Sequence, residues 1–153
     1  MLKKTFILIF FLFICSCDYK PIYSKKNIAN NSFSINKIIF EGDRMINLRV
    51  KEKLNNYQLI EKDRNFTLEI KSNSDKVIVA KNLAGDPTDF KITVTINVKI
   101  ITENGNENII IIEEDFKYSN SASKFNLRRY EKEIRNNLAE ISTEKLILRL
   151  SNI

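Results

Sequence analysis

The sequence of 153 residues predicts an α+β fold, a two-layer sandwich in which two amphipathic helices pack on a mainly antiparallel four-stranded sheet. Residues 89–101 alternate between apolar and polar side chains, which is typical of a strand with one buried face and one face in water. Residues 44–56 and 126–150 instead carry apolar side chains at helical spacing. Each helix must cover an apolar surface, and the one-sided sheet supplies it. The predicted order of elements is β-α-β-β-β-α.

Residues 32–41 are predicted as the first strand, with Phe33, Ile35 and Ile39 in one phase of the alternation. Asp43 follows as a helix N-cap, because an aspartate side chain accepts hydrogen bonds from the free N–H groups of a first helical turn. The buried stripe of this helix is expected to consist of Ile46, Val50 and Leu54, and the helix to end at Asn55–Asn56.

Residues 66–71 alternate cleanly and are predicted as the second strand. A polar break at 72–75 separates them from residues 77–79, which either continue the strand or return as part of a hairpin. A loop is expected at 82–89, where a glycine and a proline occur close together. The third strand follows, and its inward-facing side chains are predicted to be Phe90, Ile92, Val94, Ile96, Val98 and Ile100.

The fourth strand, residues 109–116, pairs back after a hairpin turn at Asn104–Gly105, where both residues are expected at positive φ. Residues 109–112 are four isoleucines, so the strand is apolar on both faces there. Either its outer face is covered at this point, or the strand forms an interface. Ser123 is a predicted N-cap for the final helix. The apolar stripe expected along that helix consists of Leu127, Tyr130, Ile134, Leu138, Ile141 and Leu148.

The N-terminus predicts export. Lys3 and Lys4 precede an apolar run, and small residues end that run before a cysteine, as in a secretory signal. Cys17 at the first position after the cut resembles the signal of bacterial lipoproteins. The apolar run from Thr5 to Ser16 has 12 residues, short of the ~20 needed to span a bilayer, which disfavours the alternative of an uncleaved anchor helix. The predicted parts are a signal peptide (1–16), a lipidated tether (17–31) and a single α+β domain (32–153).

Cys17 is the predicted lipidation site, with an S-diacylglycerol group on its thiol and an N-acyl group on its amine. One buried acyl chain, at ~0.8 kcal/mol per CH₂, anchors a protein only marginally, whereas two or more give a stable tether. Apart from this covalent lipid, no cofactor is expected. Cys15 leaves with the signal, so the mature domain can form no internal disulfide.

Composition and residue types argue against catalysis and against nucleic acid as a partner. The chain contains no histidine, and neither cysteine leaves a free thiol in the mature domain, so no Ser–His or Cys–His pair can form. The acidic cluster at 113–115 is expected to be a solvated strand end rather than a metal site. We therefore expect neither an enzyme nor a metal. A lipid-tethered, exported protein does not meet nucleic acid in its compartment.

The net charge of +6 falls to +4 once Lys3 and Lys4 leave with the signal. This excess is explained equally well by an anionic ligand and by a genome biased toward lysine, isoleucine and asparagine codons. Basic residues at the start of the final helix are a more specific signal, because positive charge there opposes the helix dipole. Arg128 and Arg129 are candidate phosphate-binding residues, with an ordinary solvated helix face as the alternative.

Residues 17–23 (CDYKPIY) resemble the Cys-Gly-Phe-Arg-Pro-Leu-Tyr opening of the LptE family of lipopolysaccharide-assembly lipoproteins, especially its alphaproteobacterial members. The predicted order of elements is also similar to that family, as is a loop at 118–120 (YSN) ahead of a long final helix. The resemblance covers essentially the whole mature chain and rests on the order of short motifs. It implies that residues 32–153 form one LptE-like domain.

The resemblance further implies a non-enzymatic outer-membrane lipoprotein on the periplasmic face. Its expected partners are an LptD-type β-barrel, which it plugs and helps to assemble, and lipopolysaccharide, which it helps to transfer to the outer leaflet. On charge alone, Arg128 and Arg129 become candidate lipopolysaccharide-binding residues. Asp18 replaces the family's glycine after the cysteine, which leaves retention in the inner membrane as an alternative. The alternative function is an accessory periplasmic lipoprotein of another lipid-transport or barrel-assembly complex.

Overall fold

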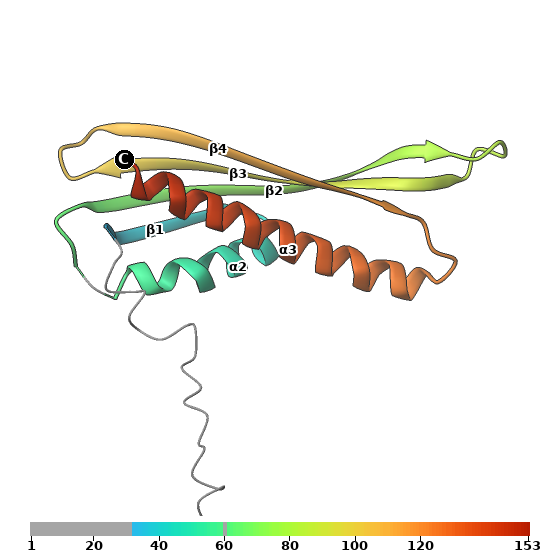
Figure 1. The fold of residues 1–153 in the computed structure, drawn as a ribbon, viewed down its shortest axis with the longest axis horizontal. Helices are drawn as coiled ribbons and strands as arrows, with labels where there is room; N and C mark the ends of the chain where they lie inside the picture. Colours follow the sequence, from blue (N-terminus) through green and yellow to red (C-terminus); the bar gives the residue numbers. More distant parts are fainter. Residues whose placement is uncertain (1–31, 60) are drawn as a thin grey trace, which may run out of the picture. The chain divides into compact units, whose positions relative to one another are not determined.

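The computed structural model describes residues 32–59 and 61–153, which form one four-stranded sheet with its helices on one face (Figure 1). The predicted fold class and order of elements are confirmed. The predicted signal peptide (1–16), Cys17 and the predicted tether (17–31) lie outside the described residues. The elements are β1 (Ser34–Gly42), α2 (Arg44–Leu54), the short 3₁₀ helix η2 (Asn55–Tyr57), β2 (Asn65–Lys81), β3 (Pro87–Thr102), β4 (Glu107–Ser119) and α3 (Lys124–Ser151).

The strands lie in chain order, β1-β2-β3-β4. β2, β3 and β4 form two antiparallel hairpins, whereas β1 runs parallel to β2. A parallel pair needs a crossover, and α2 provides it between β1 and β2. α3 packs against β3, β4 and α2, so both helices cover the same face of the sheet (Figure 1).

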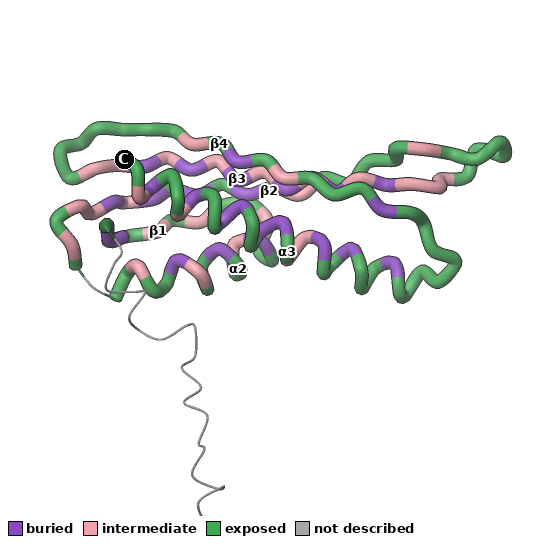
Figure 2. Tube along the Cα trace, viewed as in Figure 1, coloured by how far each residue is buried: buried purple, intermediate pink, exposed green. Residues whose placement is uncertain are grey.

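The core lies between the helices and this face of the sheet. The predicted alternation of β3 is confirmed, because all six inward side chains from Phe90 to Ile100 are buried. The predicted stripe of α2 is confirmed as well. Figure 2 shows the buried residues where α3 and the strands face each other. The fully buried side chains with the largest volumes include Phe33, Ile46, Leu54, Leu68, Ile70, Ile92, Ile96, Ile100, Leu146 and Leu150.

The connection from β1 to α2 depends on a glycine. Gly42 has φ +95, and a Cβ built on it would lie 1.9 Å from the carbonyl oxygen of Ser72, so a larger residue clashes with the backbone of β2. The predicted N-cap is confirmed next to it. The carboxylate of Asp43 accepts hydrogen bonds from the N–H groups of Met45 at 2.8 Å and Ile46 at 3.2 Å.

β1 shifts its register between Ile35 and Lys37, which changes the face that later residues occupy. Ile38 and Phe40 therefore pack against the core. Ile39 shares a phase of the sequence with the buried Phe33 and Ile35, but after the shift its side chain is exposed on the other face of the sheet.

The predicted polar break at 72–75 is wrong, and so is the hairpin alternative for 77–79, because β2 is one strand of 17 residues. The hydroxyl of Ser72 is buried and donates to the side-chain oxygen of Asn47 at 2.7 Å. Polar side chains are thus tolerated on the inward face of this strand where a polar group on a helix forms a hydrogen bond with them. β2 pairs with β3 along its whole length, so its backbone stays hydrogen-bonded through the polar segment.

The turn between β3 and β4 differs from the predicted one. Gly105 has φ +77, but Asn104 does not share this conformation, because no described residue other than glycine has positive φ. The N–H of Gly105 donates to the carbonyl oxygen of Thr102 at 2.9 Å, as in a type I turn followed by a left-handed glycine. The β2–β3 turn has the same pattern, because the N–H of Gly85 donates to the carbonyl oxygen of Asn82 at 3.0 Å.

The buried side of α3 also differs from the predicted stripe. Tyr130, Ile141 and Leu148 are exposed, so these three assignments are wrong. An α-helix has 3.6 residues per turn, and a stripe followed in steps of three, four and seven drifts around a helix of 28 residues. The buried positions are Leu127, Glu131, Ile134, Leu138, Ala139, Ser142, Thr143, Leu146 and Leu150.

Candidate functional site

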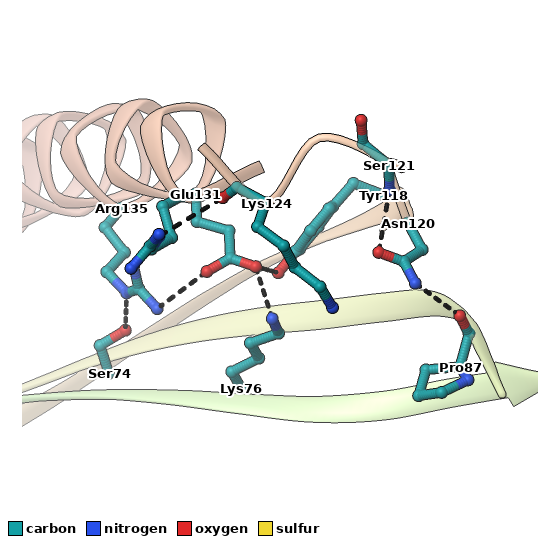
Figure 3. A network of polar contacts seen from close by, with 10 residues as sticks. Ser74, Lys76, Pro87, Tyr118, Asn120, Ser121, Lys124, Glu131 and Arg135 are labelled. Carbon is teal, nitrogen blue, oxygen red and sulfur yellow. Dashed lines mark hydrogen bonds and ion pairs between the residues drawn. The ribbon is translucent and has the colours of Figure 1, made fainter. Parts of the chain in front are cut away.

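A network of charged side chains joins the first turns of α3 to the sheet beyond the end of β1, whose pairing with β2 stops at Ser72 (Figure 3). At its centre is Glu131, which is only 7% exposed. Its Oε1 accepts hydrogen bonds from Nζ of Lys76 on β2 at 2.5 Å and from the hydroxyl of Tyr118 on β4 at 2.8 Å. One carboxylate thus ties α3 to two different strands.

Arg135 completes the network from the next turn of α3. Its Nη2 lies 4.0 Å from Oε2 of Glu131, and its Nε donates to the hydroxyl of Ser74 at 3.1 Å. Nζ of Lys76 also lies 3.9 Å from the centroid of the Phe90 ring, a cation–π contact. Two cations therefore surround one buried anion, as buried charges require.

The pKa values follow from this geometry. Burial raises the pKa of Glu131, but the hydrogen bonds from Lys76 and Tyr118 and the charges of Lys76 and Arg135 outweigh burial, so the pKa lies below its ordinary value. Burial and the hydrogen bond to Glu131 raise the pKa of Tyr118 well above its ordinary range. At neutral pH the carboxylate of Glu131 is ionised and the phenol of Tyr118 keeps its proton. The hydrogen bonds between them and from Lys76 therefore persist and hold α3 in position.

The predicted loop at 118–120 is wrong for Tyr118 and Ser119, which belong to β4, and this segment closes the end of the domain against the start of β3. The side-chain amide of Asn120 donates to the carbonyl oxygen of Pro87 at 2.8 Å. The backbone N–H of Asn120 donates to the carbonyl oxygen of Thr88 at 2.7 Å. The hydroxyl of Ser119 donates to Asp89 at 2.8 Å. The chain enters α3 from this anchored loop, with Ser123 as the N-cap that the sequence predicts.

Arg128 and Arg129 lie on α3 outside this network, and both are exposed. Nε of Arg128 approaches the carbonyl oxygen of Lys124 at 3.4 Å. Nε of Arg129 lies 3.5 Å from the carboxylate of Glu133, a pair on the helix surface that leaves the guanidinium accessible. The solvated position fits both the phosphate-binding hypothesis and its alternative. Lys76 on β2 is instead paired with Glu131.

The acidic cluster divides between the two faces of the sheet. Glu114 points toward the helices and pairs with Lys145 of α3, whereas Glu113 and Asp115 lie on the other face. Within residues 32–59 and 61–153, no group of three or more potential ligand side chains is placed to hold a metal ion. In the same part of the chain, no helix is sufficiently long and apolar to cross a bilayer.

The face of the sheet opposite the helices is open in the described structure. Ile109 and Ile111 are 73% and 59% exposed. The described residues therefore do not cover the outer face of this part of β4, and the alternative that the strand forms an interface stays a prediction. A shallow hollow of about 300 Å³ crosses this face and is lined by side chains of all four strands, among them Ile39, Lys71, Lys99 and Ile109.

Sequence reasoning missed Glu131, Tyr118 and Arg135 as a group. One signal was available, because Lys76 falls in the inward phase of β2 and Glu131 falls between apolar positions of α3. A lysine on the inward side of a strand and a glutamate on the inward side of a helix indicate an ion pair. Only the packing of α3 on the sheet shows that Lys76 and Glu131 form it.

The chain matches no known family model, and no curated protein matches it in sequence. Its structure is similar to rare lipoprotein B from Shewanella oneidensis (TM-score 0.56, 12% identity), over 76% of this chain and 98% of that one. It is also similar to a minor lipoprotein from Acinetobacter baumannii (TM-score 0.57, 14% identity), over 76% of this chain and 91% of that one.

A third similar structure is lipoprotein B from Nitrosomonas europaea (TM-score 0.52, 8% identity), over 76% of this chain and 83% of that one. Identities this low establish the shared fold alone. The chain therefore has a fold that occurs in bacterial lipoproteins, and nearly the whole length of those proteins takes part in the match.

Proposed function

We propose that this protein is an LptE-type lipoprotein, anchored through Cys17 to the periplasmic face of the outer membrane. In this proposal it occupies an LptD-type β-barrel, helps the barrel to assemble and assists the transfer of lipopolysaccharide to the outer leaflet. The observation that carries the proposal is a fold found in bacterial lipoproteins, encoded directly behind a lipoprotein-type signal. The opening at residues 17–23 points to the LptE family among them.

The architecture supports a role in binding rather than in catalysis. The buried charge of Glu131 is neutralised by the partly buried Lys76 and Arg135, and these contacts hold α3 on the sheet. Arg128 and Arg129 at the start of α3, in contrast, are exposed, in a position that suits an anionic headgroup. Arg128 and Arg129 are the residues that we assign to lipopolysaccharide phosphates, since a guanidinium matches phosphate geometry with two parallel hydrogen bonds.

Affinity capture tests the assigned partner. The tagged, lipidated protein is purified from gently solubilised membranes, with a Cys17→Ser variant as the control that cannot be lipidated. We expect a large outer-membrane barrel of the LptD type in stoichiometric amount with the lipidated protein. Recovery of inner-membrane transport components, or of no barrel, would support the accessory-lipoprotein alternative and retention through Asp18.

Lipopolysaccharide binding is tested with purified lipopolysaccharide and the non-lipidated protein. Replacing both Arg128 and Arg129 with alanine should weaken binding about tenfold, which corresponds to about 1.4 kcal/mol. The matched control removes the same charge from the surface of α2, by Arg44→Ala with Arg49→Ala. Equal affinity of the two double variants would show that net charge, and not this position, determines binding.

A further inference from the structure

β4 is an edge strand of the described sheet, and its geometry is unusually regular. It pairs with β3 from Glu107 to Ser119 without a register shift, whereas the pairings of β1 with β2 and of β2 with β3 both contain shifts. A flat antiparallel edge presents alternating N–H and C=O groups along its outer side. The backbone of β4 is therefore prepared to pair with one more strand.

Natural sheets protect such edges with proline, bulges, short strands, charged side chains or inward-pointing charged residues. β4 has 13 residues, no proline, no glycine and a single lysine, Lys117. Its four consecutive isoleucines, 109–112, have high β-propensity and carry no charge. The protection lies elsewhere on the strand: Glu114 is an inward-pointing charge, and the exposed Arg149 donates to one carbonyl oxygen, that of Ile111, at 3.3 Å.

The apolar surface at this edge is also accessible. Ile109 and Ile111 project from the open face of the sheet, and Ile109 borders the shallow hollow that extends to Ile39 on β1. A strand added beside β4 would bury both isoleucines and extend the floor of that hollow. Burial of exposed apolar surface would thus reinforce the backbone pairing.

The charges of β4 indicate what kind of strand fits. Glu107 pairs with Lys99 and Glu114 with Lys145, so two of its acidic residues are neutralised within the domain. Glu113 and Asp115 are exposed on one face and form no ion pair within the described residues. Opposite charges across neighbouring strands are favourable, and like charges are not.

A second copy of this chain does not meet that requirement. In an antiparallel pair of two β4 strands, the three registers that place at least three of isoleucines 109–112 opposite one another also place Glu107 opposite Glu113, Glu114 or Asp115. Each such register sets like charges against each other twice, because the pair is symmetric. A strand with basic side chains opposite Glu113 and Asp115 has no such conflict.

We propose that the free edge of β4 binds an extended segment of another protein, one that is apolar opposite the isoleucines and basic opposite Glu113 and Asp115. The segment becomes a fifth strand of the sheet by strand addition, in which main-chain hydrogen bonds supply affinity and side chains supply specificity. This interaction surface goes beyond the proposed function and does not depend on Cys17, Arg128 or Arg129.

The test uses the chain from residue 17 onward with Cys17→Ser, and a synthetic antiparallel peptide that matches residues 109–116 in length. The peptide carries lysines opposite Glu113 and Asp115 and valine, isoleucine or threonine elsewhere. Isothermal titration should detect binding. Methylation of the peptide amides that face β4 keeps every side chain but removes the donors, so it should weaken binding at least about tenfold.

Two protein variants make the result specific. Ile111→Lys places a charge on the edge and should weaken binding at least about tenfold, whereas Val77→Lys, on the same face of the sheet but on β2 and away from the β4 edge, should leave it unchanged. Exchanging the charges, with Glu113→Lys and Asp115→Lys in the protein and glutamates in the peptide, should restore binding that either change alone removes.

Several results would overturn the proposal. Equal binding of the methylated peptide would mean contact with a surface rather than strand addition. Absence of binding to the unmodified peptide would mean that the edge is not a docking site for such a segment. A dimer in sedimentation that Ile111→Lys dissociates would identify a second copy of this chain as the occupant.

Discussion

The two halves of α3 are attached to the same sheet by different means. The C-terminal half lies beside α2, and its inward side chains are mostly apolar, including Leu138, Leu146 and Leu150. The N-terminal half crosses the sheet where β1 no longer accompanies β2, and there Glu131 and its cations join the layers beside only two buried apolar side chains of this half of α3, Leu127 and Ile134 (Figures 1 and 3). The apolar half has a second helix and a fourth strand to pack with, and the polar half has neither.

This difference separates two contributions to the fold. Apolar burial stabilises by roughly 25 cal/mol per Å² without preferring a direction. A buried ion pair contributes little net stability, because desolvation offsets the attraction, but its hydrogen bonds require one geometry. We infer that the apolar half provides most of the stability, while the network around Glu131 determines where the start of α3, with Arg128 and Arg129, is held.

The largest expected effect is in the apolar half. Leu146→Ala removes a side chain with no exposed surface and should lower the free energy of unfolding by about 3 kcal/mol. Leu148→Ala, two residues later on the exposed side of α3, should change it by less than about 0.5 kcal/mol. Urea denaturation of both variants measures this. Similar losses at the two positions would contradict the packing described for this half.

Glu131→Gln should have a smaller effect, about 2 kcal/mol, because Lys76 and Arg135 are left partly buried without a negative partner. The pKa of Glu131 is lowered in the folded state, so its contribution is present above the ordinary value of 4.5 and is lost as pH falls below it. Urea denaturation from pH 7 to pH 3 should therefore show the two proteins converging in acid. The exposed Glu133→Gln is the control, and a difference that stays constant with pH would argue against the network.

Asp43→Ala should have the smallest effect of the three, about 1 kcal/mol, through loss of the α2 N-cap. The exposed Asp63→Ala serves as its control. The double variant with Glu131→Gln tests the comparison itself, since Asp43 caps α2, the helix beside the C-terminal half of α3, whereas Glu131 lies in the N-terminal half. Their effects on unfolding should add within about 0.5 kcal/mol, and a larger deviation would show that the halves do not behave independently.

The sequence predicts patterns within a single element in both halves, and it misses the contacts and phases that depend on other elements. The alternation of β3 and the stripe of α2 are local patterns, readable within a single element, and both are confirmed. Asp43 and Ser123 were predictable for the same reason, since capping depends on neighbours two or three residues away.

The errors occur where the partner lies in another element. Ser72, Ser74 and Lys76 look like a break in β2, but Asn47 of α2 and Arg135 and Glu131 of α3 meet them across the layers. Within residues 65–81, the inward phase of Lys76 is the one indication of these contacts, and it does not identify the partner.

Phase is the other source of error. One irregularity in β1 moves Ile39 to the open face, and slow drift of α3 moves Leu148 into solvent. Of the candidate site, Arg128 and Arg129 were predicted as exposed cations, whereas the lipidation site Cys17 lies outside the described residues.

The order of elements, with α3 after all four strands, has a consequence for folding during synthesis. The strands are made first, and the inward side of β3, from Phe90 to Ile100, is not covered by α3 until the 28 residues of that helix follow. An uncovered apolar sheet is prone to aggregate during this interval. A chain truncated before α3 is therefore expected to aggregate, because this face of the sheet is never covered.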